Sequence, residues 1–275
     1  MPGKLYLVAT PIGNLGDVSP RAEETLRNAD FIAAEDTRVT MKLLTHFDIK
    51  KQLVSYYEHN RAESGEKIIS RLIAGETCAL VSDAGMPAIS DPGEDLVRQC
   101  AENGIEVSII PGPCAAVSAL ALSGLPTGRF TFEGFLSVTK NARFEHLDSL
   151  RSEKRTMIFY EAPHKLVTTL RDMLEVLGDR RLALCRELTK IHEEVRRTTI
   201  AQALHYYEEN APRGEFVLIV EGAADTDTAS ATLEDALALV EQFKSEGMSL
   251  KDASKRASQR TGISKNAIYD AAIGK

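Results

Sequence analysis

The residues that could do chemistry gather directly after short apolar runs, and the most acidic group reads Glu35-Asp36-Thr37-Arg38. The preceding run, Phe31–Ala34, predicts a buried strand. Side chains just past the carboxyl end of a strand in a parallel sheet face the crevice where ligands bind. There a carboxylate can hold ribose hydroxyls, orient a substrate or take up a proton. A simple salt bridge to Arg38 fits the same residues, so both interpretations stay open.

A longer loop follows the apolar run Thr77–Ser82. It reads SDAGMP over Ser82–Pro87 and continues with Asp91-Pro92-Gly93-Glu94. Two glycines, two prolines and two aspartates make a shaped loop rather than a minimal connection. Because a rigid sheet would position the exposed backbone N–H and C=O groups of such a loop, we predict that it holds a ligand.

Two more strand ends carry unusual turns, TPIGNLGD over Thr10–Asp17 and PGPCAA over Pro111–Ala116. Four such loops at one edge of a sheet predict a single concave site. The chain lacks the G-x-G-x-x-G dinucleotide fingerprint and the G-x-x-x-x-G-K-[ST] phosphate loop. It also lacks C-x-x-C and H-E-x-x-H sets, so we predict no metal site.

The elements that position these loops alternate between strand and helix patterns, which predicts an α/β fold with a largely parallel sheet. Ser19-Pro20 marks one helix start, with Ser at the N-cap and Pro at the first helical position. The pattern breaks at Leu125-Pro126-Thr127-Gly128, so the first domain is predicted over residues 1–124. Its predicted strands are Lys4–Ala9, Phe31–Ala34, Gln52–Tyr57, Thr77–Ser82 and Ile105–Ile110; its predicted helices are Pro20–Asn28, Arg61–Ala74, Gly93–Asn103 and Pro113–Ser123.

A second α/β domain is predicted over residues 125–222. Two strand patterns between Arg181 and Ile200 follow each other without a helix, which predicts a hairpin and therefore a mixed sheet. The predicted strands are Thr131–Leu136, Arg155–Glu161, Arg181–Arg186, Glu194–Ile200 and Glu215–Glu221; the predicted helices are Ala142–Arg151, Pro163–Leu177 and Ala201–Glu209.

The last part of the chain differs in composition from the rest. Residues 223–232, AADTDTASAT, are small and acidic and predict a flexible linker. Residues 233–275 predict a tail of three short helices, with a helix-turn-helix corner at Thr261-Gly262-Ile263-Ser264. From Lys244 onward the tail has a net charge of +4 in a chain whose net charge is −7. This asymmetry fits a nucleic-acid contact or a solvated helix face.

Composition favours a cytoplasmic protein. The four cysteines are widely spaced, which fits reduced, buried thiols. The N-terminal residues lack the apolar core of a signal peptide, and no apolar run approaches the roughly 20 residues of a membrane helix. We therefore expect no membrane association. The net charge argues against a protein that coats nucleic acid non-specifically, although a local basic patch would still permit an RNA substrate.

Eight ordered blocks, PIGNL, EDTR, VSDAGMPAISDPG, PGPCAA, FEGFL, FYEAPHKL, CRELTK and GEFVLIVEG, together resemble the tetrapyrrole-methylase-like family of S-adenosylmethionine-dependent methyltransferases. Within it they are most similar to the bacterial branch that methylates a cytidine ribose 2′-hydroxyl in small-subunit (16S) ribosomal RNA. The resemblance covers nearly the whole chain. It implies two α/β domains with S-adenosylmethionine in the cleft between them, a homodimer, and ribosomal RNA or the small ribosomal subunit as partner.

The resemblance also implies which residues contact the cofactor. One departure is Met86, where the family pattern favours Thr, so a hydroxyl contact would be lost or replaced by a backbone amide; Lys165 likewise stands where Arg is common. The implied cofactor residues are Pro11, Asp83, Ala84, Gly85, Met86, Pro87, Pro111, Cys114, Ala115, Gly134, Phe135, Leu136, Leu188, Thr189, Gly214 and Glu215.

Methyl transfer from a sulfonium needs alignment of hydroxyl, methyl and sulfur more than acid catalysis. A ribose hydroxyl is a poor nucleophile, so a base or a charge that favours the alkoxide should help. Lys190 is the first candidate for stabilising the oxygen charge, with a nearby carboxylate as proton acceptor. The other catalytic candidates are Glu35, Asp36, Arg186 and Glu187, although Arg186 and Glu187 also fit a purely structural ion pair.

RNA contacts are expected from basic residues in both domains and the tail. The expected set is Arg38, Arg143, Arg155, Lys165, Arg196, Arg197, Lys251, Lys255, Arg256 and Lys265. Two rival functions remain open at this stage. A tetrapyrrole or other small-molecule methyltransferase would not need the helical tail, and a non-catalytic RNA-binding assembly factor would not need the elaborate strand-end loops.

Overall fold

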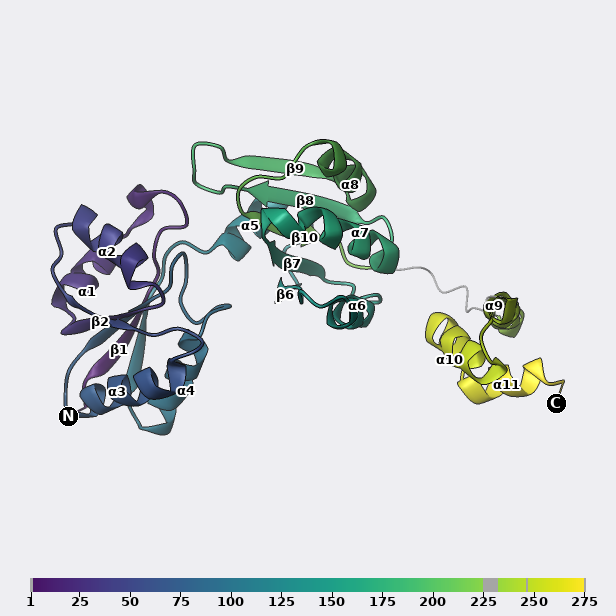
Figure 1. Ribbon diagram of the computed structural model, residues 1–275, viewed down its shortest axis with the longest axis horizontal. Helices are drawn as coiled ribbons and strands as arrows, with labels where there is room; N and C mark the ends of the chain where they lie inside the picture. Colours follow the sequence, from purple (N-terminus) through teal and green to yellow (C-terminus); the bar gives the residue numbers. More distant parts are fainter. Residues whose placement is uncertain (1, 225–231, 246, 275) are drawn as a thin grey trace. The chain divides into compact units, whose positions relative to one another are not determined.

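The computed structural model describes residues 2–224, 232–245 and 247–274. The chain divides into two compact units, residues 1–222 and residues 223–275. Most of the predicted linker, residues 225–231, lies outside the described residues. Figure 1 shows the two five-stranded sheets of the first unit and the helices of the second.

The first sheet is entirely parallel, in the order β3-β2-β4-β1-β5. Its central strands, β2 and β4, are buried along their whole length, as expected for strands covered on both faces. Because β4 lies between β2 and β1, the loops after these three strands are neighbours at one edge of the sheet. The strands are β1 (Lys4–Val8), β2 (Phe31–Ala34), β3 (Gln52–Ser55), β4 (Cys78–Val81) and β5 (Glu106–Ile110).

Helices cover both faces of this sheet. One face packs on α3 (Arg61–Ile73) and α4 (Gly93–Glu102), and the other packs on α1 (Pro20–Asn28) and α2 (Thr37–His46). Helix α2 was not among the predicted helices. It begins immediately after β2, with Asp36 as N-cap, so the four-residue acidic motif is at once a strand end and a helix start. A short 3-10 turn over Leu15–Asp17 precedes α1.

The second sheet is mixed, in the order β6-β7-β10-β8-β9. Only β6 and β7 pair in parallel; β10 pairs antiparallel with β7 and β8, and β8 and β9 form the predicted hairpin. All five residues of β10 are buried, and alternate residues face opposite sides. The strands are β6 (Phe130–Phe135), β7 (Thr156–Glu161), β8 (Arg181–Arg186), β9 (Glu194–Thr199) and β10 (Phe216–Val220).

Three helices, α6 (Lys140–Ser149), α7 (Leu166–Leu177) and α8 (Ile200–Glu209), bury one face of the second sheet (Figure 1). A 3-10 turn over Pro163–Lys165 leads into α7. The opposite face packs on α5 (Ala115–Ser123), through Ala116, Ala119 and Leu120. Helix α5 precedes the boundary predicted after residue 124, yet it packs on the second sheet. Since α5 starts at the end of β5, it ties the two sheets together and places its N-terminus between them.

The C-terminal unit contains α9 (Leu233–Ser245), α10 (Leu250–Thr261) and α11 (Lys265–Ala272) around a small core of its own. That core includes Val240, Phe243 and Ile268. Gly262 ends α10 in the left-handed conformation, and Ser264 caps α11, which is the predicted turn. Among the described residues, none of the helices combines the length and apolar character needed to cross a bilayer.

Candidate functional site

The loops after β1 and β4 are joined by a two-way backbone bridge. Thr10 N–H donates to the Gly85 carbonyl over 2.9 Å, and Gly85 N–H donates to the Thr10 carbonyl over 3.0 Å. The buried Thr10 hydroxyl also donates to the Ser82 carbonyl over 3.2 Å. Gly85 has φ +85°, a conformation that costs a residue with a Cβ about 1–2 kcal/mol. The two loops therefore act as one rigid wall.

The loops after β2 and β4 are joined by their acidic residues. The Asp83 carboxylate accepts the Asp36 N–H over 2.9 Å, and Asp83 N–H donates to the Glu35 carboxylate over 3.4 Å. Asp36 is engaged by Arg38, whose guanidinium lowers the pKa of Asp36 to about 2. Burial, followed by the nearby charge of Asp83, raises the pKa of Glu35. Burial also raises the pKa of Asp83. Glu35 and Asp83 thus hold negative charge at an energetic cost, which a bound cation would relieve.

The loop between β4 and α4 is fixed by Asp91. Its Oδ1 accepts the N–H groups of Ala88, over 3.0 Å, and Gly93, over 2.7 Å. Ala88 and Ser90 both have positive φ, 67° and 63°. Non-glycine residues in this region are uncommon and cluster at functional sites, where the surrounding structure holds them.

A network of charged residues connects the carboxyl end of β8 with the amino end of β10. Glu187 Oε1 accepts the Glu215 N–H over 3.0 Å and a hydrogen bond from Lys190 Nζ over 2.9 Å. Lys190 Nζ also lies 3.0 Å from Glu215 Oε2. Although burial opposes the charge, these two carboxylates raise the pKa of Lys190. Glu187 has φ 51°, an uncommon conformation for a residue with a side chain, and this charged network holds it in place.

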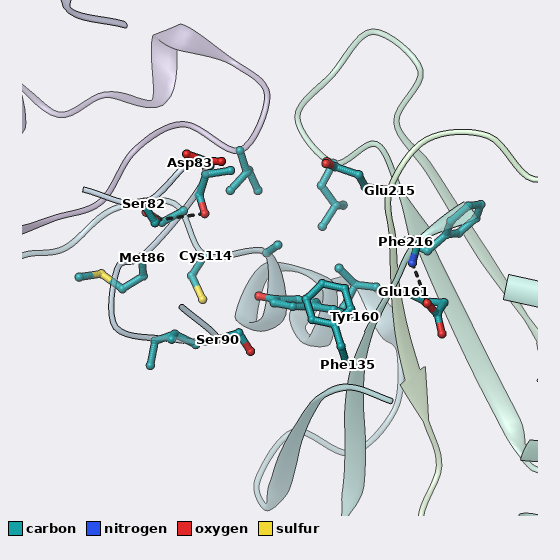
Figure 2. A pocket seen from close by; sticks show the side chains of 18 of the residues that line it. Ser82, Asp83, Met86, Ser90, Cys114, Phe135, Tyr160, Glu161, Glu215 and Phe216 are labelled. Carbon is teal, nitrogen blue, oxygen red and sulfur yellow. Dashed lines mark hydrogen bonds between the residues drawn. The ribbon is translucent and has the colours of Figure 1, made fainter. Parts of the chain in front are cut away.

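These loops enclose a cavity of about 480 Å³. The first sheet contributes the turn after β4 and the start of α5, and the second sheet contributes the ends of β6, β7, β8 and β10. Figure 2 shows Asp83, Met86 and Cys114 on one side of it and Phe135 and Glu215 on the other. A cavity of this size fits a ligand of the dimensions of a nucleoside with a short side chain.

Two aromatic side chains give the cavity an apolar wall. Phe135 is 57% exposed, and its ring centroid lies 5.5 Å from that of Tyr160. The Tyr160 hydroxyl accepts the Ala116 N–H over 3.1 Å, which leaves its own proton free to donate. Burial raises the pKa of Tyr160 to about 12, so the hydroxyl stays protonated at neutral pH. Figure 2 shows this hydroxyl directed away from the second sheet, toward the side of Cys114.

The charged lining of the cavity is entirely acidic. No Lys, Arg or His of the described residues lines it. A lining of this sign attracts a ligand of net positive charge and disfavours one of net negative charge such as a phosphate. The six acidic residues are Glu35, Asp83, Asp91, Glu161, Glu187 and Glu215.

The structure brings many of the sequence-predicted residues to this cavity. Those that line it are Asp83, Ala84, Gly85, Met86, Cys114, Ala115, Phe135, Leu188 and Glu215 from the cofactor set, with Glu35 and Glu187 from the catalytic set. Other members lie next to the lining without being part of it. Gly214, for example, packs so closely on Glu187 that an added Cβ would lie 2.5 Å from Glu187 Cγ. The predicted residues outside the lining are Pro11, Pro87, Pro111, Gly134, Leu136, Thr189, Gly214, Asp36, Arg186 and Lys190.

Sequence reasoning missed part of the lining, above all at the end of β7. The FYEAPHKL block carries Tyr160 and Glu161, and its match to the family pattern was the available signal. Both residues line the cavity, and Glu161 also accepts a hydrogen bond from Thr169 Oγ1 over 2.5 Å. Ile12, Ser82 and Asp91 lie in loops predicted to form the site but were not named as site residues. The other unnamed lining residues are Ile89, Ser90, Tyr160, Glu161, Ala162, Pro163, Cys185, Phe216 and Val217.

The expected RNA contacts fall into distinct groups, and one requires correction. Arg143 is 9% exposed, with its Nε 2.6 Å from Asp172 Oδ2 and its Nη1 2.9 Å from the Ser137 carbonyl. It holds α6 against α7 and the loop after β6, so it does not present its charge to RNA.

Other basic residues of the first unit have local partners. Arg155 pairs with Glu153, Arg196 pairs with Glu194 and stacks on Tyr206, and Arg197 donates to the Leu122 carbonyl. Lys165 is partly buried at the start of α7. The Arg38 side chain is 87% exposed despite its ion pair with Asp36. In the C-terminal unit Lys251, Lys255 and Arg256 are exposed and Lys265 is partly buried.

Comparison with protein families gives two matches. Residues 4–204 match the family of tetrapyrrole (corrin/porphyrin) methylases, and residues 223–275 match the family described as the RsmI C-terminal HTH domain. Among solved structures, a cobalt precorrin-4 methyltransferase aligns with a TM-score of 0.60 at 17% identity, covering 79% of this chain and 94% of that one. A uroporphyrin-III C-methyltransferase from Thermus thermophilus, complexed with S-adenosyl homocysteine, aligns with a TM-score of 0.55 at 17% identity, covering 79% and 97%. These structures share the fold.

Relatives of known name are much closer in sequence. The ribosomal RNA small subunit methyltransferase I of Halalkalibacterium halodurans is 51% identical, over 98% of this chain and 94% of that protein. The protein of the same name from Thermotoga maritima is 49% identical, over 80% of this chain and 99% of its own length, so its whole length is about that of residues 1–222. The family matches and these identities confirm the predicted fold and the predicted class of S-adenosylmethionine-dependent methyltransferase. The chain belongs to the tetrapyrrole methylase family, in the branch that carries the C-terminal helix-turn-helix domain.

Proposed function

We propose that this protein methylates ribosomal RNA of the small subunit, at the ribose 2′-hydroxyl of a cytidine, with S-adenosylmethionine as methyl donor. The observation that carries the proposal is identity of about half, over nearly the full chain, to relatives named as ribosomal RNA small subunit methyltransferase I. Fold neighbours below 25% identity include enzymes of quite different substrates, so they add no information about the substrate here.

The cavity fits the proposed cofactor. S-adenosylmethionine has two positive groups, an ammonium and a sulfonium, and one negative carboxylate, so its net charge is positive. It also has an aromatic base. An acidic lining suits the excess positive charge, and the exposed face of Phe135 suits the base. When bound, the cofactor supplies a methyl group on a positively charged sulfur, which leaves as a neutral thioether. Asp83 and Glu215, on opposite sides of the cavity, would bind the cationic groups (Figure 2).

Tyr160 and the N-terminus of α5 form the polar end of the same cavity. Ala116 N–H is taken by the Tyr160 hydroxyl, so that hydroxyl presents its proton to the ligand. Cys114 and Ala115 precede it and leave space for close approach of a ligand to the backbone. Met86 contributes only its thioether and backbone to the lining, so the contact given elsewhere in the family by a hydroxyl would come from Tyr160 or a backbone amide.

Lys190 was the first candidate for stabilising the developing oxygen charge, but its contacts favour a positioning role. Its ammonium is bonded to Glu187 and Glu215 and does not line the cavity. Lys190 neutralises part of the negative charge of Glu187 and Glu215, which do line the cavity, and fixes the orientation of their side chains. Arg186 lies outside the lining as well and pairs with Glu194 over 3.0 Å, across the β8–β9 hairpin.

RNA binding is assigned to exposed basic residues that are not part of the cavity lining. Arg38 lies at the start of α2, beside the acidic strand ends, and the tail carries Lys251, Lys255 and Arg256 on its surface. A relative of the same name spans only the length of residues 1–222. The C-terminal unit is therefore expected to strengthen RNA binding and to leave the chemistry to the first unit.

A homodimer in the cytoplasm completes the proposal. Helix α5 is apolar on all sides, and its outward side chains Val117 and Leu122 are 55% and 38% exposed. An apolar surface next to the cavity suits self-association. Light scattering on the purified protein would give twice the chain mass of 30.1 kDa for a dimer.

The decisive test uses small ribosomal subunits from cells that lack this enzyme. The protein is incubated with these subunits and labelled S-adenosylmethionine, and the RNA is then digested and mapped by mass spectrometry. One methyl group on a cytidine ribose is the expected product. Label on a tetrapyrrole precursor but not on RNA would favour the small-molecule rival, and binding without any transfer would favour the assembly factor.

A further inference from the structure

A second cavity, of about 560 Å³, adjoins the cofactor cavity in the first sheet's half of the unit. The start of α3, the turn before α4 and the first turns of α4 form most of its wall. Three residues, Glu35, Ser90 and Asp91, line both cavities and therefore form the wall between them. The other lining residues are Glu58, Arg61, Pro92, Glu94, Asp95 and Arg98.

The charges of the second cavity do not suit a phosphate. Both arginines are already paired, Arg61 with Glu58 over 3.2 Å and Arg98 with Glu102 over 2.9 Å. The carboxylates that line this cavity outnumber its two arginines, so the lining has a net negative charge. Such a lining accepts hydrogen bonds from neutral ligands that carry several donors. A nucleoside offers such donors in its ribose hydroxyls and, in cytosine, in the exocyclic amino group, which carboxylates bind.

Asp91 gives independent evidence that a donor is missing. Its Oδ1 is used by two backbone N–H groups, but its Oδ2 is enclosed and has no hydrogen-bond partner among the described residues. A buried carboxylate oxygen without a partner is costly. Asp91 lies in the shared wall, so this wall contains a carboxylate oxygen whose hydrogen bonding the fold itself leaves incomplete.

The geometry of methyl transfer locates the acceptor oxygen. The attacking oxygen must lie on the far side of the methyl group from the sulfur, so it approaches from outside the cofactor cavity. The shared wall satisfies this requirement if the nucleoside enters from the second cavity. Of its three residues, Ser90 has a neutral hydroxyl and Asp91 is fixed to the backbone. Glu35 is the carboxylate with only one weak hydrogen bond, 3.4 Å from Asp83 N.

We propose that the second cavity receives the target nucleoside of the RNA and that its ribose 2′-hydroxyl donates to the carboxylate of Glu35. In the transfer step, Glu35 takes the hydroxyl proton while the ribose oxygen bonds the methyl carbon and the carbon–sulfur electron pair stays on sulfur. The phosphates remain outside, near the exposed Arg38. The inference rests on the proposed function and assigns the substrate site and proton acceptor within it.

The test measures binding without turnover. Small subunits are reconstituted with either cytidine or 2′-deoxycytidine at the nucleotide mapped above, and their affinities for the enzyme are measured with S-adenosylhomocysteine present. Wild-type enzyme should bind the ribose form about tenfold more tightly, because the hydroxyl bonds a charged group. Glu35→Ala should abolish this preference. A preference that survives in Glu35→Ala overturns the proposal.

Glu35→Gln keeps the side-chain volume and tests the proton step separately. It should bind subunits within about threefold of wild type, lower S-adenosylmethionine affinity by no more than about tenfold because one cavity charge is lost, and slow transfer at saturating cofactor by at least about 100-fold. The matched control is Glu24→Gln, an exposed glutamate on α1 that should leave both binding and transfer unchanged. Wild-type transfer rates in a folded Glu35→Gln would refute the role of Glu35, whereas absence of transfer by wild type on any subunit would refute the proposed function instead.

Discussion

Replacement of Arg143 by Ala should destabilise the first unit without a direct effect on RNA binding. Arg143 and Asp172 are 9% and 6% exposed and form a buried ion pair. Loss of the guanidinium leaves the Asp172 carboxylate buried without its partner and frees the carbonyls of Ser137 and Val138. Breaking a buried pair in this way costs about 3–5 kcal/mol. For a unit of this size each kcal/mol lowers the melting temperature by about 2–4 °C, so we expect a decrease of roughly 6–20 °C.

Calorimetric unfolding gives the melting temperature, and subunit binding is measured well below it over a range of salt concentrations. The control is the double variant Arg143→Met with Asp172→Leu, which removes both charges and keeps the volume. It should recover most of the lost stability, because neither charge is then left unpaired. A folded Arg143→Ala with near-normal stability, but with weaker binding and a shallower salt dependence, would show that Arg143 contacts RNA and would refute this reasoning.

Three further predictions follow from the site and the two-unit organisation. Burial raises the pKa of Glu35, so the folded chain binds the Glu35 proton more tightly than the unfolded chain does, and wild type loses stability as pH rises above the ordinary pKa of 4.5. Glu35→Gln should therefore have a higher melting temperature than wild type at neutral pH. This difference in melting temperature should vanish as pH falls to 4.5. Gly214→Ala places a Cβ 2.5 Å from Glu187 Cγ at φ +80°, and urea unfolding should show a loss of at least about 1–2 kcal/mol. Removal of residues 223–275 should leave S-adenosylmethionine affinity unchanged and weaken subunit binding by at least about tenfold, as measured by calorimetry and by filter binding.

Much of the fold followed from local patterns in the sequence. The alternation of apolar runs and amphipathic stretches predicted the parallel sheet, and the closely spaced strands after Arg181 predicted the hairpin of β8 and β9. Helix α2 was missed because the acidic motif before it was interpreted only as a strand end. Asp36 follows the end of β2 and is also the N-cap of α2, because its carboxylate accepts the Arg38 N–H over 2.8 Å.

The site was predictable only in part, for a physical reason. Strand-end loops such as Asp83–Pro87 are visible as sequence motifs, and four residues of this one, Asp83 to Met86, line the cavity. Apart from the family resemblance of the block that contains it, Tyr160 carries no signal in the sequence, because its role depends on α5 packing against the second sheet and offering the Ala116 N–H. Arg143 was misjudged for the same reason: its partner, Asp172, lies on another helix, and nothing near Arg143 in the sequence shows that the pair is buried.

The most direct test of the central claim is calorimetric titration of S-adenosylmethionine into the wild-type protein, Asp83→Asn and the control Glu24→Gln. We expect one cofactor per chain, an affinity about tenfold lower for Asp83→Asn because one cavity charge is lost, and no change for the control. A folded wild-type protein that does not bind the cofactor, or an affinity that Asp83→Asn leaves unchanged, would contradict the assignment of this cavity as the methyl-donor site.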